Sequence, residues 1–142
     1  MTSWAEFEAA APELASLVRA RFEATGLAFL ATVRKDGSPR ITGIEPTFED
    51  GELVLGMMAG SRKGADLRRD PRLALHAASV DKEVKEGDAK VSGRAVLVQE
   101  DPHDQWRVDV TEVSLLRPGE PLDHLVIQWW RPGAEVTTHK RY

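Results

Sequence analysis

The residues with the clearest chemical potential lie in one short segment, Ser61–Arg72. It contains five basic and two acidic side chains, a local charge of +3 in a chain whose formal net charge is −4. Ser61 is a typical N-cap residue, and Arg62 and Lys63 then fall in the first helical turn. A helix N-terminus attracts anions, whereas cations placed there oppose its dipole. The segment therefore predicts either a phosphate site or a solvated amphipathic helix that buries Leu67.

A second segment, Arg40–Ile44, has the alternation of a β-strand. Side chains alternate between the two faces of a strand, so Arg40, Thr42 and Ile44 share one face. Gly43 leaves the other face without a side chain, which would let a flat ligand or a neighbouring backbone approach closely. The same glycine is also typical of a bulge in a curved barrel.

Two pairs of large side chains add candidate ring contacts. Met57-Met58 offers polarizable surface to a flat ring, although a methionine is commonly part of a core. Trp129-Trp130 would place its two indoles on opposite faces of a strand, so that one packs in the core while the other meets a partner or cofactor. Of these four residues we assign Met57 and Trp130 to the cofactor site, and the alternative is that they are only packing residues.

Several classes of chemistry are excluded by composition. The chain has no cysteine, which removes disulfides, thiolate chemistry and cysteine-ligated metals, so a redox role needs a bound cofactor. The four histidines have no metal-ligand spacing, and the motifs of serine hydrolases, dinucleotide-binding folds and P-loops are absent. We therefore name no catalytic residue and no metal ligand. The acidic net charge gives no drive toward nucleic acid or an anionic membrane.

The N-terminal part of the sequence predicts two helices. Ser3 and Glu6 have the spacing of a capping box, which predicts a first helix. Pro12 fits the first turn of a second helix, which Gly26 would end.

From Gly26 onward the hydrophobic period is two, with Asp-Gly turns, which predicts antiparallel strands. The expected strands are Leu27–Val33, Arg40–Phe48, Glu52–Met58, Arg72–Ala78, Ala89–Gln99, Val108–Leu116 and Leu122–Trp130. We also expect a short helix at Ser61–Asp70, a charged loop at Asp81–Asp88 and a helical turn near Pro102–Trp106. Because the first strand is apolar on both faces, it should be covered on both sides.

Length and pattern together predict the class of protein. The 142 residues suit one domain, residues 1–142, that is mainly β, with six or seven antiparallel strands forming a barrel or a sandwich. The acidic N-terminus does not have the pattern of a signal peptide, and the longest apolar run is too short to span a bilayer. We expect a cytoplasmic protein that binds neither membrane nor nucleic acid.

The order of these motifs closely resembles the pyridoxamine 5′-phosphate oxidase-like family of flavin-binding split β-barrels. The resemblance covers roughly residues 12–131. It is carried by Phe29-Leu30-Ala31-Thr32-Val33, Asp36-Gly37-Ser38-Pro39-Arg40, Asp50-Gly51-Glu52-Leu53, Ser61-Arg62-Lys63, Asp66-Leu67-Arg68-Arg69-Asp70-Pro71-Arg72 and Trp130-Arg131-Pro132-Gly133. The Ser-x-Lys element followed by Asp-Leu-x-x-Asp-Pro-Arg is its most specific part.

This resemblance implies a split β-barrel homodimer with two cofactors at the subunit interface. The cofactor would be FMN or, in one branch of the family, a deazaflavin. Ser61, Arg62 and Lys63 would hold its phosphate, and the strand Arg40-Ile41-Thr42 would run beside its rings. The implied activity is an oxidoreductase acting on an unidentified small molecule.

Alternatives to this activity are a deazaflavin-dependent reductase and a non-catalytic binder of flavin or haem on the same fold. The chain lacks the long C-terminal extension with an Arg-x-His pattern that vitamin B6 oxidases carry. We therefore expect a reaction other than vitamin B6 oxidation.

Overall fold

The computed structural model describes all 142 residues, and the chain begins with two helices, α1 (Trp4–Ala10) and α2 (Pro12–Thr25). The Ser3 hydroxyl accepts a hydrogen bond from the Glu6 amide at 3.1 Å and so caps α1. Pro12 occupies the first turn of α2, and Gly26 ends that helix with a left-handed φ of 71°. The predicted boundaries of both helices are confirmed.

Nine strands follow, two more than the upper limit we predicted. They are β1 (Ala28–Val33), β2 (Pro39–Ile44), β3 (Thr47–Glu49), β4 (Glu52–Met57), β5 (Arg72–Ala77), β6 (Asp88–Gln99), β7 (Asp104–Pro118), β8 (Leu125–Trp130) and β9 (Thr137–Arg141). The third helix, α3 (Arg62–Arg69), lies between β4 and β5 in the chain. The predicted class, mainly β with an N-terminal helix and a short helix after the third predicted strand, is confirmed.

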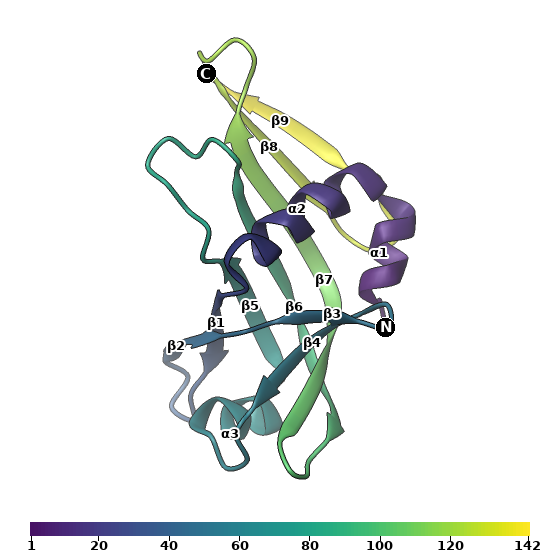
Figure 1. Ribbon diagram of the computed structural model, residues 1–142, viewed down its shortest axis with the longest axis vertical. Coiled ribbons are helices and arrows are strands. Elements are labelled where there is room, and N and C mark those ends of the chain that lie inside the picture. Colours follow the sequence, from purple (N-terminus) through teal and green to yellow (C-terminus); the bar gives the residue numbers. More distant parts are fainter.

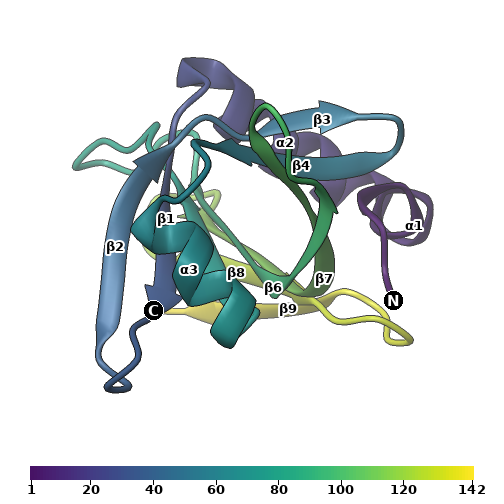
Figure 2. The same ribbon diagram turned by 90° about the horizontal axis from the view of Figure 1, so that it is seen from below.

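The strands form one antiparallel sheet in the order β2-β1-β5-β6-β7-β4-β3. The long strand β7 pairs with β6 along one edge, while β4 and β8 share its other edge. β4 pairs near the start of β7, from Asp104 to Arg107, and β8 pairs from Val113 to Pro118. The curved, unclosed sheet seen in Figure 2 is therefore a split barrel.

Three details differ from the sequence-based prediction. The strand expected at Arg40–Phe48 is divided into β2 and β3 around Pro46, a residue that has no amide hydrogen for a sheet ladder. The helical turn expected near Pro102–Trp106 is wrong, because β7 already begins at Asp104. The last strand, β9, was not predicted at all.

The core lies inside the curved sheet and under the N-terminal helices (Figure 1). Trp4 and Phe7 of α1 are fully buried, and the Phe7 ring lies 4.9 Å from that of Trp130. None of the helices is long and apolar enough to cross a membrane.

The outer face of β1 is open in the single chain, so of the two covers that we expected, helices or another subunit, the helices do not supply it. Phe29 is 46% exposed, and Ile41, which is on the same face of the neighbouring strand β2, is 72% exposed. The inward-facing Leu30 is fully buried. The expected second cover is therefore absent from this chain.

Candidate functional site

Helix α3 is built from the sequence element that predicted a phosphate site. The Ser61 hydroxyl accepts a hydrogen bond from the Gly64 amide at 3.1 Å, so Ser61 caps the helix as expected. Leu67 is buried, so the helix is amphipathic as predicted, and its capped N-terminus is compatible with the phosphate site that the segment also predicts. The exposed Arg62 guanidinium makes no hydrogen bond or ion pair with the protein, which leaves its charge available at the start of the helix.

A pocket of about 470 Å³ opens beside the first turn of α3. Its lining comes from α3 and from the ends of β2 and β4: Leu27, Gly43, Ile44, Glu45, Gly56, Met57, Met58 and Lys63. The Lys63 ammonium donates a hydrogen bond to the Gly43 carbonyl oxygen at 3.2 Å, which holds the lysine at the pocket. The structure thus brings Lys63 and Met57 to one cavity, with Ser61 and Arg62 on the same turn.

Gly43 and Gly56 leave space on the pocket wall. A Cβ atom at either position would have no other heavy atom within 4 Å. The β1–β2 ladder runs through Gly43 without a register shift, so the alternative that Gly43 forms a bulge is wrong. The register shifts of the sheet lie between β6 and β7, and at one of them a Cβ at Gly93 would come within 2.3 Å of the Asp109 carbonyl oxygen.

Arg40, Thr42 and Ile41 are placed on the two faces of β2. Arg40 is opposite Thr32 in the ladder and Ile41 is opposite Ala31. The side chains of Arg40 and Thr42 are half-buried on the inner face, while Ile41 points outward. The Thr42 hydroxyl is buried and has no hydrogen-bond partner in the chain. The shared face of Arg40, Thr42 and Ile44 agrees with the prediction.

Asp66 is the centre of a buried polar network that sequence reasoning did not assign. Its carboxylate accepts hydrogen bonds from the Thr32 hydroxyl and from Arg40 Nε, both at 2.7 Å. Arg69 Nη2 donates to the other carboxylate oxygen at 3.0 Å. Asp66 is only 3% exposed, and its bonds to Thr32 and Arg40 tie α3 to β1 and β2.

Opposing effects act on the pKa of Asp66. Burial alone would raise the pKa, but the hydrogen bonds from Arg40, Thr32 and Arg69 outweigh it, so the pKa is lowered from its usual value. Asp66 is therefore an anion at neutral pH. Arg40 uses Nε for this carboxylate, while its terminal amino groups donate to no protein atom.

A second ion pair fixes the other side of α3. Arg68 donates to the buried Asp104 at 3.0 Å and to Glu100 at 3.3 Å, and its guanidinium lies 5.4 Å from the centre of the Trp106 ring. These bonds join α3 to the start of β7. Helix α3 is therefore held on one side by the bonds of Asp66 and on the other by those of Arg68, which fixes the position of its first turn.

Trp130 is separated from the other predicted site residues. It is 3% exposed and packs against Phe7 of α1, so within this chain its indole is a core side chain. Trp129 is half-buried on the opposite face of β8. The structure also contains no cluster of three side chains that would suit a metal ion.

Comparison with known proteins identifies the sequence pattern. A family model described as pyridoxamine 5′-phosphate oxidase matches residues 14–117. No curated protein matches the sequence.

Solved structures share the fold. A pyridoxamine 5′-phosphate oxidase-related, FMN-binding protein from Nostoc punctiforme has a TM-score of 0.69 at 12% identity, over 93% of this chain and 96% of that one. PhzG from Burkholderia lata, solved with tetrahydrophenazine-1-carboxylic acid, has a TM-score of 0.66 at 14% identity, over 91% and 88% of the chains. A heme-binding protein from Mycobacterium smegmatis has a TM-score of 0.53 at 17% identity, over 87% and 57% of the chains.

Proposed function

The chain belongs to the pyridoxamine 5′-phosphate oxidase family, and from this premise we propose that it is an FMN-dependent oxidoreductase acting on a small molecule. The observation that carries the proposal is the pocket beside the first turn of α3, where Lys63 faces two open glycine positions. A phosphate group and a flat ring system need these two features together: cationic donors at a helix N-terminus, and a wall without side chains.

The residues present fit such a cofactor. The open positions at Gly43 and Gly56 form a cradle that any larger residue would partly fill, and Lys63 lies at the same pocket.

Each residue then has a defined task. Lys63 and Arg62 supply two positive charges for the phosphate, and the Ser61 hydroxyl, whose oxygen caps the helix, retains its hydrogen for donation. The terminal amino groups of Arg40 add donors from β2, while Met57 and the glycines border the rings.

The bound flavin supplies the hydride or electron chemistry, and the protein contributes position and polarity. Of the two charged side chains that line the pocket, Lys63 is assigned to the phosphate and Glu45 has no assigned partner, so we name no catalytic side chain. The substrate of the reaction is therefore determined by which small molecules can enter the pocket and contact the flavin.

We further propose that the working unit is a homodimer with each site closed by the second chain. Leu27 and Met58 line the pocket and are 48% and 76% exposed. They continue into the uncovered outer faces of β1 and β2, where Phe29 and Ile41 are also exposed. Exposed apolar surface of this kind commonly marks a protein interface. A second copy placed on it would bury these side chains and cover the pocket.

The proposal is tested by loading the purified protein separately with FMN, a deazaflavin coenzyme and haem. After gel filtration, the absorption spectrum and the mass of the released molecule identify what was retained. We expect FMN to remain at about one molecule per chain. Retention of only the deazaflavin would contradict FMN as the cofactor, and retention of haem alone would make the chain a haem binder.

The enzymatic part needs a separate measurement. The absorbance of the bound flavin is followed while candidate electron donors and acceptors of low molecular mass are added. Repeated reduction and reoxidation on addition of a donor and an acceptor supports an oxidoreductase. A flavin that stays bound without turnover across the panel would support the non-catalytic binding protein instead.

A further inference from the structure

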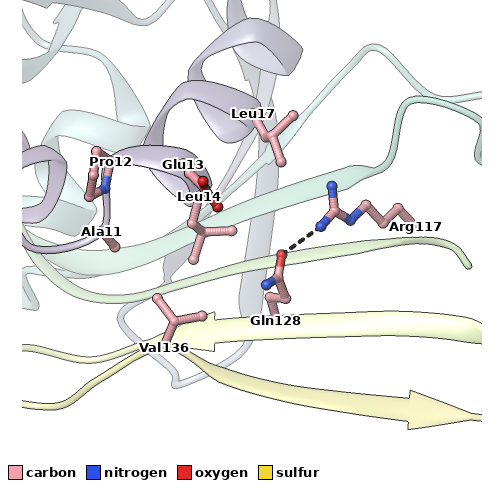
Figure 3. A pocket seen from close by; sticks show the side chains of 8 residues that line it. All are labelled: Ala11, Pro12, Glu13, Leu14, Leu17, Arg117, Gln128 and Val136. Carbon is pink, nitrogen blue, oxygen red and sulfur yellow. Dashed lines mark hydrogen bonds between the residues drawn. The ribbon is translucent and has the colours of Figure 1, made fainter.

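A second pocket lies at the other end of the molecule from α3, between the start of α2 and strands β7 to β9 (Figure 1). It has a volume of about 330 Å³, near the lower limit for small-molecule sites. Figure 3 shows the eight side chains that line it: Ala11, Pro12, Glu13, Leu14, Leu17, Arg117, Gln128 and Val136. None of these residues belongs to the proposed flavin site.

The pocket contains one cation, which is fixed in place. Arg117 is half-buried, and its Nη2 donates a hydrogen bond to Gln128 Oε1 at 3.0 Å. Gln128 is held in turn by its Nε2, which donates to the Thr138 hydroxyl at 3.2 Å. No carboxylate pairs with Arg117, so its remaining N–H groups are available. A planar guanidinium with free N–H groups is suited to a carboxylate.

The pocket also contains one anion, Glu13, in the first turn of α2. Glu13 and Arg117 line the same cavity but form no ion pair, so their charges are kept apart. Much of the rest of the wall is apolar: Leu14 and Ala11 are buried, and Leu17 and Val136 also line the pocket (Figure 3). A ligand that matches this wall has two opposite charges and an apolar body.

Space for the apolar body is not confined to this cavity. An adjoining hollow of about 480 Å³ shares Pro12, Glu13, Leu17 and Arg117 with the pocket and adds Ser16. Glu13 and Arg117 therefore line both hollows, and the apolar contacts are supplied by the first pocket, through Leu14, Leu17 and Val136.

We propose that this pocket binds a small zwitterion with an apolar side chain, the chemistry of a free apolar amino acid. The ligand carboxylate accepts hydrogen bonds from Arg117, its ammonium group donates to Glu13, and its side chain lies against Leu14 and Val136. A neutral ligand in a pocket of zero net charge leaves neither protein charge uncompensated. The inference is independent of flavin binding, because the two pockets share no residue.

The test is a titration of the ¹⁵N-labelled protein followed by nuclear magnetic resonance, with L-norleucine, hexanoate and hexylammonium as probes. Norleucine has both charges, and each of the other probes has one charge on a similar chain. We expect norleucine to shift the Leu14, Arg117 and Val136 amides saturably, with an affinity at least about 10-fold above that of either single-charge probe. Equal affinities of norleucine and hexanoate, or no saturable shift, would overturn the proposal.

Variants assign the two charges. Arg117→Gln and Glu13→Gln should each weaken norleucine binding about 10-fold, the loss of one charged hydrogen bond. Arg107→Gln, at the other end of β7, is the matched control and should leave the affinity unchanged. Unchanged affinity in Arg117→Gln would place norleucine elsewhere.

A variant that fills the pocket tests the site independently, in case Arg117→Gln does not fold. Leu17→Trp changes a partly exposed position of α2, so the fold should be retained while the added ring occupies the cavity. Loss of norleucine binding with an unchanged melting temperature supports the site. Binding that persists in Leu17→Trp contradicts it.

Discussion

Among single residues, we expect Lys63 and Arg62 to contribute most to phosphate binding. Lys63→Ala and Arg62→Ala should each raise the dissociation constant of FMN by about 10- to 150-fold, the range for a charge-assisted hydrogen bond. The free energy of unfolding of the apoprotein should change by less than about 0.5 kcal/mol for the exposed Arg62. Calorimetric titration with FMN and denaturant unfolding measure the two effects.

The control for these variants is Lys35→Ala. Lys35 is an exposed lysine in the turn between β1 and β2, away from the pocket lining. It should leave the FMN affinity unchanged. If Lys63→Ala and Arg62→Ala bind FMN as the wild type does, the phosphate site is not at the start of α3.

Asp66 should matter for stability more than any other charged residue of α3. Asp66→Ala removes the buried partner of Arg40, and breaking a buried ion pair costs on the order of 3 kcal/mol. Denaturant unfolding at neutral pH measures this loss. A loss below about 1 kcal/mol would mean that the network is not formed in solution.

The lowered pKa of Asp66 also gives the sign of a pH effect. A carboxyl whose pKa is lower in the folded state stabilises the fold above its unfolded pKa, near 4. That stabilisation is lost as the pH falls through the folded pKa. The wild type should therefore lose free energy of unfolding below about pH 4 more steeply than Asp66→Asn, and parallel curves would contradict the assigned hydrogen bonds.

Individual residues were predictable where one local pattern controls them. Strand alternation placed Arg40 and Thr42 on the same face, and capping preference placed Ser61 at the helix start. The partnership of Asp66 with Thr32 was not predictable, because it joins positions 34 residues apart. A signal for it existed: Thr32 is the one polar residue in an apolar strand and needs a buried partner.

Among the elements, α3 is capped by Ser61, and substitution can separate this cap from the phosphate contact that we propose for the same residue. Ser61→Ala should cost about 1 kcal/mol of unfolding free energy, because the helix loses its cap. Ser61→Asp should retain the cap and the stability, since aspartate is a good N-cap residue, but should repel the phosphate and weaken FMN binding. Parallel losses of stability and affinity in both variants would show that Ser61 acts only as a cap.

The elements that were predicted correctly have a hydrophobic face, and the missed ones do not. Every residue of β9 is exposed, so its sequence has no alternation to detect. The start of β7 was mistaken for a helical turn because the buried position 104 is an aspartate paired with Arg68, where the pattern calls for an apolar residue. A charged residue that is buried in an ion pair looks like a surface residue in a hydrophobic pattern, so its burial cannot be predicted from that pattern.

At the scale of the whole molecule, the outer faces of β1 and β2 should hold two chains together. Ile41→Asp places a charge on this surface, where the isolated chain would tolerate it because Ile41 is 72% exposed. We expect the variant to sediment as a monomer and to bind FMN more weakly than the wild type. Val98→Asp, a change at another exposed apolar position, should leave the dimer intact. A wild-type monomer that binds FMN tightly would contradict the shared site.

The architecture as a whole was only partly predictable from the hydrophobic pattern, which allowed a barrel or a sandwich. The choice depends on how β7 divides one edge between β4 and β8, and these strands are far apart in the chain. The order of the motifs around Ser61 decided between a barrel and a sandwich, because the family that the sequence resembles has a split β-barrel. The family match and the structure both agree with that choice.

Binding of FMN through its phosphate at the start of α3 can be measured by calorimetric titration with FMN and with riboflavin. Riboflavin has the same rings without the phosphate. We expect one FMN per chain, an FMN affinity at least about 10-fold above that of riboflavin, and loss of this difference in Lys63→Ala. Equal affinities for FMN and riboflavin in the wild type, or no binding of either at high micromolar concentration, would contradict it.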